Sequence, residues 1–319
     1  MKTSKTVVFG YDELLLESLE FLSAIGSEVP VVVFPSSRQD ARANNIREIV
    51  KEKGHTIIEQ PPSARGTGFA QALNDIAPDA ILVWSYPMIL PKEVLEIPKR
   101  GAVNVHLGLL PEYRGVNGVR WALLNGEDQT GVTLHFMDAG IDSGNMIARA
   151  SFPIAPEDDI RSLMQKSKIA GRRLLENSWA GIVSGNLRTM PQDESKAKYY
   201  SAKMTPSCEI DWSKSNVDIH NLIRASAAPF ARAYTSWNGG ALLMKKSSPV
   251  DAIRDEKRPG TVEHLDSSGL TIATGKGDLL ITEIELDGET IKPGAFSDLG
   301  IKPGIVLPSL QPDAEELQQ

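Results

Sequence analysis

Residues 6–35 read TVVFGYDELLLESLEFLSAIGSEVPVVVFP, and this stretch decides the fold class. An apolar β-branched run at 6–10 is followed by a helical pattern at 12–26 and by a second apolar run at 29–35. A strand, a helix and a second strand in this order are typical of a βαβ unit, in which a helix connects two parallel strands. We therefore expect a parallel sheet that is covered by helices on both faces.

The alternation of strands and helices continues beyond this stretch. Further strand patterns lie at 55–60, 79–85, 102–106, 130–137 and 148–154, and further helical patterns lie at 41–54, 68–78, 118–127 and 158–185. This order predicts an α/β domain over residues 1–187 with a doubly wound, mostly parallel sheet.

The second half of the chain has a different pattern. Residues 188–206 are polar and predict a linker between two domains. Residues 207–308 contain one helical pattern followed by short strand patterns that are separated by Gly and Asp turns, which predicts a small β-barrel domain. The last residues, 309–319, are polar and are expected to be disordered.

Composition excludes several classes of protein. The 319 residues include 41 acidic and 34 basic side chains, so the net charge of −7 does not indicate a nucleic-acid-binding surface over the whole chain. A single cysteine, Cys208, excludes an intrachain disulfide, and the five histidines have no metal-binding spacing, so we expect no metal. The N-terminal apolar run is broken by Gly10 and Asp12, so we expect neither a signal peptide nor a membrane span, and a cytoplasmic location.

Three side chains are candidates for catalysis. Asn104 and His106 lie in NVHLGLLPEYRGVNG (104–118), and Asp142 lies in MDAGIDSGNMI (137–147). An amide, an imidazole and a carboxylate can together bind a developing oxyanion and manage one proton. Each also has a structural alternative, because a lone histidine is often only hydrogen-bonded, and Asn or Asp often stabilises a turn.

The combined pattern N-x-H-x-x-L-L-P-x-x-R-G and G-[IL]-D-[ST]-G-x-[MI] resembles the formyltransferases that use 10-formyltetrahydrofolate. That family includes methionyl-tRNA formyltransferases and amino-sugar N-formyltransferases. VVFGYDELLLESL, PDAILVWSYPMILPKEVL and EIDWSKSNVDIHNLIRASAAPFARAY resemble other parts of the family, so the likeness covers nearly the whole chain. It implies a Rossmann-like catalytic domain, an OB-like C-terminal barrel and 10-formyltetrahydrofolate as the donor.

The resemblance also implies a role for each candidate residue. Asn104, His106 and Asp142 match the family's catalytic trio. His106 and the amide of Asn104 would stabilise the oxyanion that forms when an amine attacks the formyl carbon. Asp142 would orient the imidazole, favour its charged form and accept the proton of the amine.

Two further groups of residues follow from the resemblance. The folate pocket would be lined by Tyr86, Met88, Ile89, Leu90, Asp138, Gly140 and Ile141, although the first four could instead only pack under the sheet. The acceptor side would comprise Leu110, Pro111, Arg114 and Gly115, although Arg114 could be a solvated surface charge. The family usually has Ser where this chain has Gly108 and Pro where it has Gly118, and both differences lie in the acceptor-side loop.

The acceptor amine is less constrained by the sequence. Residues 35–54 have mixed charge where a tRNA-binding enzyme would carry a basic insertion, and the C-terminal region is not strongly basic. We therefore expect a small amine as acceptor, with a nucleotide-activated amino sugar as the first candidate. The alternatives are formylation of initiator methionyl-tRNA, hydrolysis of the donor to formate, and a catalytically inert folate-binding or tRNA-chaperone-like module. The sequence leaves a homodimer open.

Overall fold

The computed structural model describes residues 4–63, 68–228, 230–251 and 258–309. The chain divides into two compact units. Unit 1 comprises Met1–Gly118, Gln129–Pro153 and Gln165–Ser201, and unit 2 comprises Val119–Asp128, Ile154–Met164 and Ala202–Gln319. Most of the predicted disordered tail, residues 310–319, lies outside the described residues.

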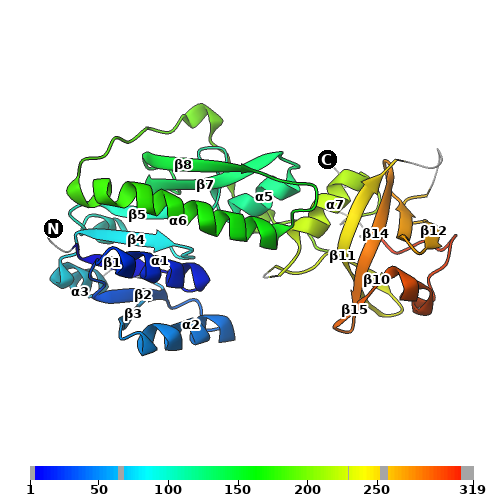
Figure 1. The fold of residues 1–319 in the computed structure, drawn as a ribbon, viewed down its shortest axis with the longest axis horizontal. Helices are drawn as coiled ribbons and strands as arrows, with labels where there is room; N and C mark the ends of the chain where they lie inside the picture. Colours follow the sequence, from blue (N-terminus) through cyan, green and yellow to red (C-terminus); the bar gives the residue numbers. More distant parts are fainter. Residues whose placement is uncertain (1–3, 64–67, 229, 252–257, 310–319) are drawn as a thin grey trace. The chain divides into compact units, whose positions relative to one another are not determined.

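Unit 1 is built on a seven-stranded sheet with the order β3-β2-β1-β4-β5-β7-β8 (Figure 1). Its strands are β1 (Thr6–Phe9), β2 (Val31–Pro35), β3 (Thr56–Gln60), β4 (Ala80–Trp84), β5 (Ala102–His106), β7 (Gln129–Phe136) and β8 (Met146–Pro153). The first five strands in this order are parallel, whereas β7 is antiparallel to both β5 and β8. The predicted mostly parallel α/β sheet is therefore confirmed.

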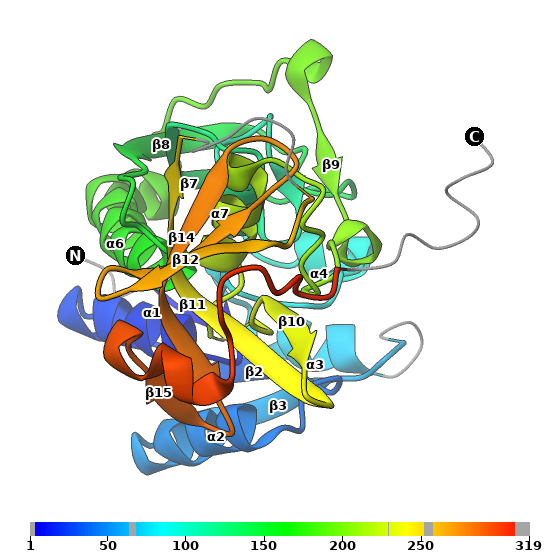
Figure 2. The ribbon, with the colours of Figure 1, turned by 90° about the vertical axis from the view of Figure 1, so that its right-hand side faces the viewer.

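Both faces of this sheet are buried, as a parallel sheet requires. On one face, side chains of β1, β2 and β4 pack against α3 (Phe69–Ile76) and α4 (Lys92–Leu95). On the other face lie α1 (Glu13–Ala24) and α6 (Ile160–Ser184) (Figures 1 and 2). A Cβ atom at Gly171 of α6 would lie 2.6 Å from the buried ring of Trp84, so this glycine allows the helix to approach the sheet.

The helix boundaries follow from local chemistry. The carboxylate of Asp12 accepts a hydrogen bond from the backbone N–H of Leu14 at 3.0 Å and begins α1. The longest helix, α6, is followed by Gly185, whose φ of +72° is typical of a residue that ends a helix. The helical patterns at 41–54 and 118–127 correspond to α2 (Ala41–Glu52) and α5 (Gly118–Leu124).

Unit 2 contains an antiparallel sheet with the order β10-β11-β14-β13-β12, and β15 pairs with β14. These strands are β10 (Tyr234–Trp237), β11 (Gly240–Val250), β12 (Val262–Asp266), β13 (Gly269–Ala273), β14 (Asp278–Leu286) and β15 (Glu289–Ile291). The helix α7 (Asn216–Ala225) packs against β11, and Trp212 and Phe296 are fully buried in the core. The expected small C-terminal β-barrel domain is confirmed, as an antiparallel, barrel-like domain. Across the described ranges, no helix combines the length and apolar character needed to span a membrane.

The predicted linker contains more structure than its polarity indicates. Residues 190–200, which we call the strap, include the 3-10 helix η1 (Glu194–Lys196) and the short strand β9 (Tyr199–Tyr200). β9 pairs in parallel with β6 (Arg114–Gly115), and Met190 exchanges two backbone hydrogen bonds of 2.8 Å with Met146. The strap therefore belongs to unit 1 and lies against the segment that follows β5.

Candidate active site

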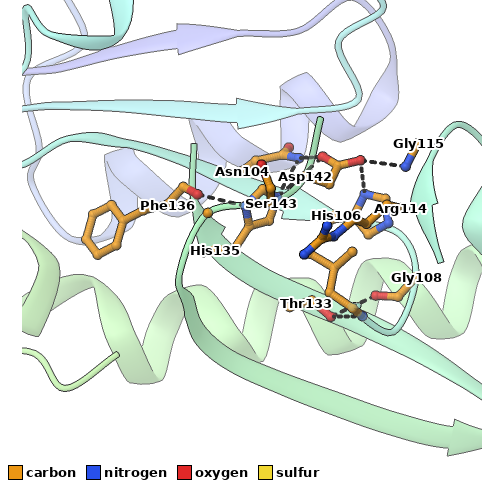
Figure 3. Close-up of polar contacts among 12 residues, drawn as sticks. Asn104, His106, Gly108, Arg114, Gly115, Thr133, His135, Phe136, Asp142 and Ser143 are labelled. Carbon is orange, nitrogen blue, oxygen red and sulfur yellow. Dashed lines mark hydrogen bonds and ion pairs between the residues drawn. The ribbon is translucent and has the colours of Figure 1, made fainter. Parts of the chain in front are cut away.

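The three candidate catalytic side chains meet at one place in unit 1 (Figure 3). Asn104 and His106 are two residues apart in β5, so they point to the same face of the sheet. Asp142 lies in the β7–β8 loop and reaches both of them. Its carboxylate lies 3.5 Å from Nδ1 of His106 and accepts a hydrogen bond of 3.4 Å from Nδ2 of Asn104.

The backbone conformation of the β7–β8 loop places the side chain of Asp142 in the site. The φ of Asp142 is +51°, a left-handed conformation that costs a non-glycine residue about 1 kcal/mol. A Cβ atom at Gly144 would lie 1.9 Å from the carbonyl oxygen of Phe136, so only glycine fits there. The backbone N–H of Gly115 donates a hydrogen bond of 2.8 Å to the Asp142 carboxylate and fixes its orientation.

A second histidine, which the sequence analysis missed, completes the cluster. His135 in β7 lies directly opposite Asn104 in β5, and its side chain is 1% exposed. Its Nδ1–H donates to the carbonyl of Phe136 at 2.8 Å, which leaves Nε2 to accept from the Asn104 amide at 3.2 Å. Nε2 also lies 3.5 Å from the Asp142 carboxylate. We call Asn104, His106, His135 and Asp142 the quartet.

A backbone carbonyl determines the tautomer of His106. Nε2 of His106 lies 2.7 Å from the carbonyl oxygen of Tyr113, and a carbonyl can only accept, so Nε2 carries the proton. In the neutral ring, Nδ1 then has a free lone pair that faces Asp142. Gly108 makes room for this geometry, because a Cβ atom there would lie 2.9 Å from Nε2 of His106.

The charges of Asp142 and His106 follow from their surroundings. Burial raises the pKa of Asp142, but His106, His135 and the N–H of Gly115 outweigh burial and hold this pKa well below its usual range. Burial lowers the pKa of His106, and the attraction of Asp142 does not fully compensate. Asp142 favours the charged imidazole, but desolvation has the larger effect, so the pKa of His106 is lowered overall. Near neutral pH, the site presents a carboxylate beside a neutral imidazole, and both can accept a proton.

The acceptor-side residues are mostly buried, and Arg114 is not a solvated surface charge. Its guanidinium is 0% exposed and donates to both carboxylate oxygens of Glu194, at 2.6 and 2.9 Å. It also donates to the Tyr199 hydroxyl and to Oε1 of Gln192, at 2.5 and 3.0 Å. Arg114 thus binds the strap through these hydrogen bonds. It connects the strap to the quartet because the next residue, Gly115, donates its N–H to Asp142.

Two acceptor-side residues shape the loop beneath the quartet. Leu110 is fully buried, and its backbone N–H donates to the Thr133 hydroxyl at 3.1 Å. Pro111 is also buried, and its carbonyl accepts a hydrogen bond from the N–H of Lys198, in the strap. Neither side chain is exposed at the surface, so both residues hold the loop in place.

The residues predicted for the folate pocket differ in exposure. Ile89 and Ile141 are 76% and 52% exposed, so their aliphatic surfaces are available to a ligand. Leu90 is buried in the core, and the Tyr86 ring packs edge-on against Phe9. Met88 is half-buried.

The loop that carries Asp142 has its own internal support. Oδ1 of Asp138 accepts hydrogen bonds from the N–H of Gly140 and the hydroxyl of Ser143, at 2.9 and 2.8 Å. The three residues predicted to bind the donor in this loop, Asp138, Gly140 and Ile141, are all exposed. Among the residues that the structure describes, no group of three or more His, Cys, Asp or Glu side chains is arranged to hold a metal ion.

Two family descriptions match this chain. Residues 17–178 match the family described as Formyl transferase, and residues 203–297 match the one described as Formyl transferase, C-terminal domain. A methionyl-tRNA formyltransferase of Alkaliphilus oremlandii (strain OhILAs) is 33% identical over 289 residues, which are 89% of this chain and 93% of the relative. The methionyl-tRNA formyltransferase of Trichlorobacter lovleyi is 35% identical over 288 residues, which are 89% of this chain and 90% of the relative.

Solved structures share the fold. An N-formyltransferase from Helicobacter canadensis, in complex with folinic acid and dTDP-3-aminofucose, has a TM-score of 0.66 at 21% identity, covering 88% of this chain and 99% of that one. HypX from Aquifex aeolicus, in complex with tetrahydrofolic acid, has a TM-score of 0.61 at 18% identity, covering 92% of this chain and 46% of that one. At these identities, the likeness shows a common fold.

Proposed function

The chain belongs to the formyl transferase family, and we propose that its quartet transfers the formyl group of 10-formyltetrahydrofolate to a primary amine. The observation that carries this proposal is the position of the Asp142 carboxylate, which lies between two imidazoles and an amide donor in a buried site. Acyl transfer to an amine needs a proton acceptor for the amine and a donor for the oxyanion, and the quartet supplies both.

The reaction can be written with these side chains in stated roles. The amine nitrogen attacks the formyl carbon, and the carbonyl oxygen becomes an oxyanion. The Asn104 amide donates a hydrogen bond to this oxyanion by releasing its longer hydrogen bond, of 3.4 Å, to Asp142. Nδ1 of His106 takes the proton that the amine loses, and the carboxylate of Asp142 stabilises the resulting imidazolium. The tetrahedral intermediate then expels the folate nitrogen, which receives that proton, so the products are an N-formyl amine and tetrahydrofolate. No covalent bond to the protein forms.

The energetic contributions can be ranked. One oxyanion donor typically contributes about 3 kcal/mol to lowering the barrier, or a factor of about 100 in rate. Holding the amine and the formyl carbon in reacting geometry can contribute about 7 kcal/mol more. Positioning of the two substrates is therefore the larger contribution.

For the donor, we propose that the pterin ring covers the exposed side chains of Ile89 and Ile141. These residues come from the loops after β4 and β7, and Ile141 directly precedes Asp142 of the quartet. Aliphatic side chains with backbone polar groups at the rim suit a flat, polar-edged ring. Leu90 and Tyr86 support this surface from the core.

Initiator methionyl-tRNA is the first candidate for the acceptor. The two curated relatives described above are methionyl-tRNA formyltransferases, and each aligns with 89% of this chain at 33% or 35% identity. This order of candidates is the reverse of the one expected from the charge pattern. Full-length likeness at this identity is stronger support than the composition of one segment.

A small amine, such as an amino sugar on a nucleotide carrier, is the second candidate. Basic residues of the segment after β2 are paired with acidic residues, and acidic residues outnumber basic ones in the C-terminal region. After β2, Arg42 is paired with Glu13, Arg47 with Glu59 at 3.1 Å, and Lys51 with Glu48 at 2.8 Å. Residues 202–319 contain 12 Lys and Arg against 17 Asp and Glu. Binding to tRNA phosphates depends on cations that are free to replace counterions, which this distribution does not favour.

One competition experiment decides between the acceptors. Donor labelled in the formyl group is incubated with the protein and with methionyl-initiator tRNA and a dTDP-linked amino sugar together, and the labelled product is identified. We expect label on the tRNA, with a rate that falls steeply between 50 and 200 mM salt, in keeping with about 10³-fold weaker binding for several phosphate contacts. Label on the sugar alone would assign the second candidate. Label appearing only as formate, with or without amine, would contradict formyl transfer.

A further inference from the structure

Gln192 lies in the strap, and its side chain forms hydrogen bonds that its sequence context does not predict. Its side-chain Nε2 donates to the carbonyl oxygens of Asp142 and Gly144, at 2.7 and 2.8 Å. Its Oε1 accepts from Nε of Arg114 at 3.0 Å. One half-buried amide therefore uses both of its hydrogens on the catalytic loop and its oxygen on the guanidinium that fastens the strap.

The hydrogen bond from Gln192 to Asp142 is made to the backbone of a residue in a left-handed conformation. Asp142 has a φ of +51°, and a residue in this region keeps its conformation only when its surroundings fix it. Gln192 binds the carbonyl of that same residue, while Gly115 binds its carboxylate at 2.8 Å. Gly115 directly follows Arg114, which is the other partner of Gln192. The two ends of Asp142 are thus held by one connected network.

The network also fixes which way the Gln192 amide points. Arg114 is a permanent donor, so it selects the oxygen of the amide and turns the NH₂ group toward the loop. Glu194 holds Arg114 from the strap through both carboxylate oxygens, at 2.6 and 2.9 Å. The orientation of Gln192 therefore depends on an ion pair whose cation is fully buried.

We propose that Gln192 is a positioning residue for formyl transfer, which acts by holding Asp142 in its left-handed conformation at the quartet. This inference rests on the proposed function of Asp142. Gln192 does not touch the reacting atoms, so its loss should lower kcat and leave the KM values of donor and acceptor nearly unchanged. A residue that only stabilised the fold would instead lower the amount of active protein.

Gln192→Glu tests this proposal, because a carboxylate keeps the shape and the partner for Arg114 but cannot donate to the two carbonyls. We expect kcat to fall about 10-fold with KM values within twofold, and cooperative thermal unfolding to be retained. Gln129→Glu, a matched change at an exposed glutamine in β7, is expected to leave kcat unchanged. Gln192→Met repeats the test without the added charge.

A double-mutant cycle with Asp142→Asn separates positioning from a structural role. If Gln192 acts through the Asp142 carboxylate, Gln192→Glu should cost less than twofold in the Asp142→Asn background. Three outcomes would overturn the proposal. Gln192→Glu could lower kcat equally in both backgrounds, or its kcat could lie within twofold of wild type. Alternatively, both Gln192 variants could lose cooperative unfolding. A wild-type rate for Asp142→Asn alone would instead contradict the proposed function.

Discussion

Replacing Asp142 by Asn is expected to lower the rate of formyl transfer about 1,000-fold while the fold remains intact, because general acid–base groups contribute factors of this size. Asn has the same shape and can still accept the N–H of Gly115. It cannot carry the negative charge of the Asp142 carboxylate, whose pKa is held well below its usual range in the folded protein. The imidazolium that forms during the reaction would therefore lose its counter-charge. Single-turnover measurements with saturating donor and acceptor give this rate directly.

The control for this prediction is Asp75→Asn, at an exposed aspartate in α3. It removes the same charge from the protein and is expected to change the rate by less than twofold. Circular dichroism and the thermal midpoint show whether each variant is folded. A folded Asp142→Asn protein with a rate within about threefold of wild type would remove Asp142 from the mechanism.

Replacing His106 by Ala is expected to lower the rate about 100-fold, because the site loses the group that accepts the proton of the amine. The pH dependence adds a more specific expectation. Burial lowers the pKa of His106 below the ordinary 6.5, so the ring is neutral and able to accept a proton at neutral pH. As the pH falls through this lowered pKa, the ring becomes charged and the wild-type advantage disappears. Protonation of the acceptor amine changes the rates of both proteins in the same way. The ratio of wild-type to variant rates is therefore independent of it.

The measurement is therefore the ratio of the two rates between pH 5 and pH 8. The ratio should fall toward 1 on the acid side, with a midpoint below 6.5. His264→Ala, at a histidine of β12 in unit 2, controls for removal of a ring and should follow the wild-type profile. A ratio that does not change over this pH range would contradict the role of His106 as the proton acceptor.

The sequence predicts the fold class and the common face of Asn104 and His106 for physical reasons that act locally. Alternation within a strand places Asn104 and His106 on one face wherever that strand lies in the sheet. The apolar runs and amphipathic patterns are long enough to identify most strands and helices of unit 1. The position of Asp142 follows from the family resemblance, since its contact with β5 spans 36 residues to His106.

His135 and the strap were not predictable in this way. His135 joins the quartet only because β7 pairs antiparallel to β5 in the register that sets it opposite Asn104, and this pairing has no signal in a single sequence. The strap is polar and has no apolar period, and backbone hydrogen bonds to Arg114 and Val116 hold it in place. The burial of Arg114 likewise depends on Glu194, 80 residues away, which the sequence pattern does not connect with it.

The tautomers of the two histidines test the account most directly, because they decide where a proton can be accepted. Nitrogen chemical shifts of the protein labelled with ¹⁵N-histidine distinguish a protonated from an unprotonated ring nitrogen, and the His106→Ala variant assigns the signals. Between pH 7 and pH 8, we predict that neutral His106 carries its proton on Nε2 and that His135 carries its proton on Nδ1, as the carbonyls of Tyr113 and Phe136 require. A His106 ring that is protonated on Nδ1 at this pH would contradict the account, since no lone pair would then face Asp142.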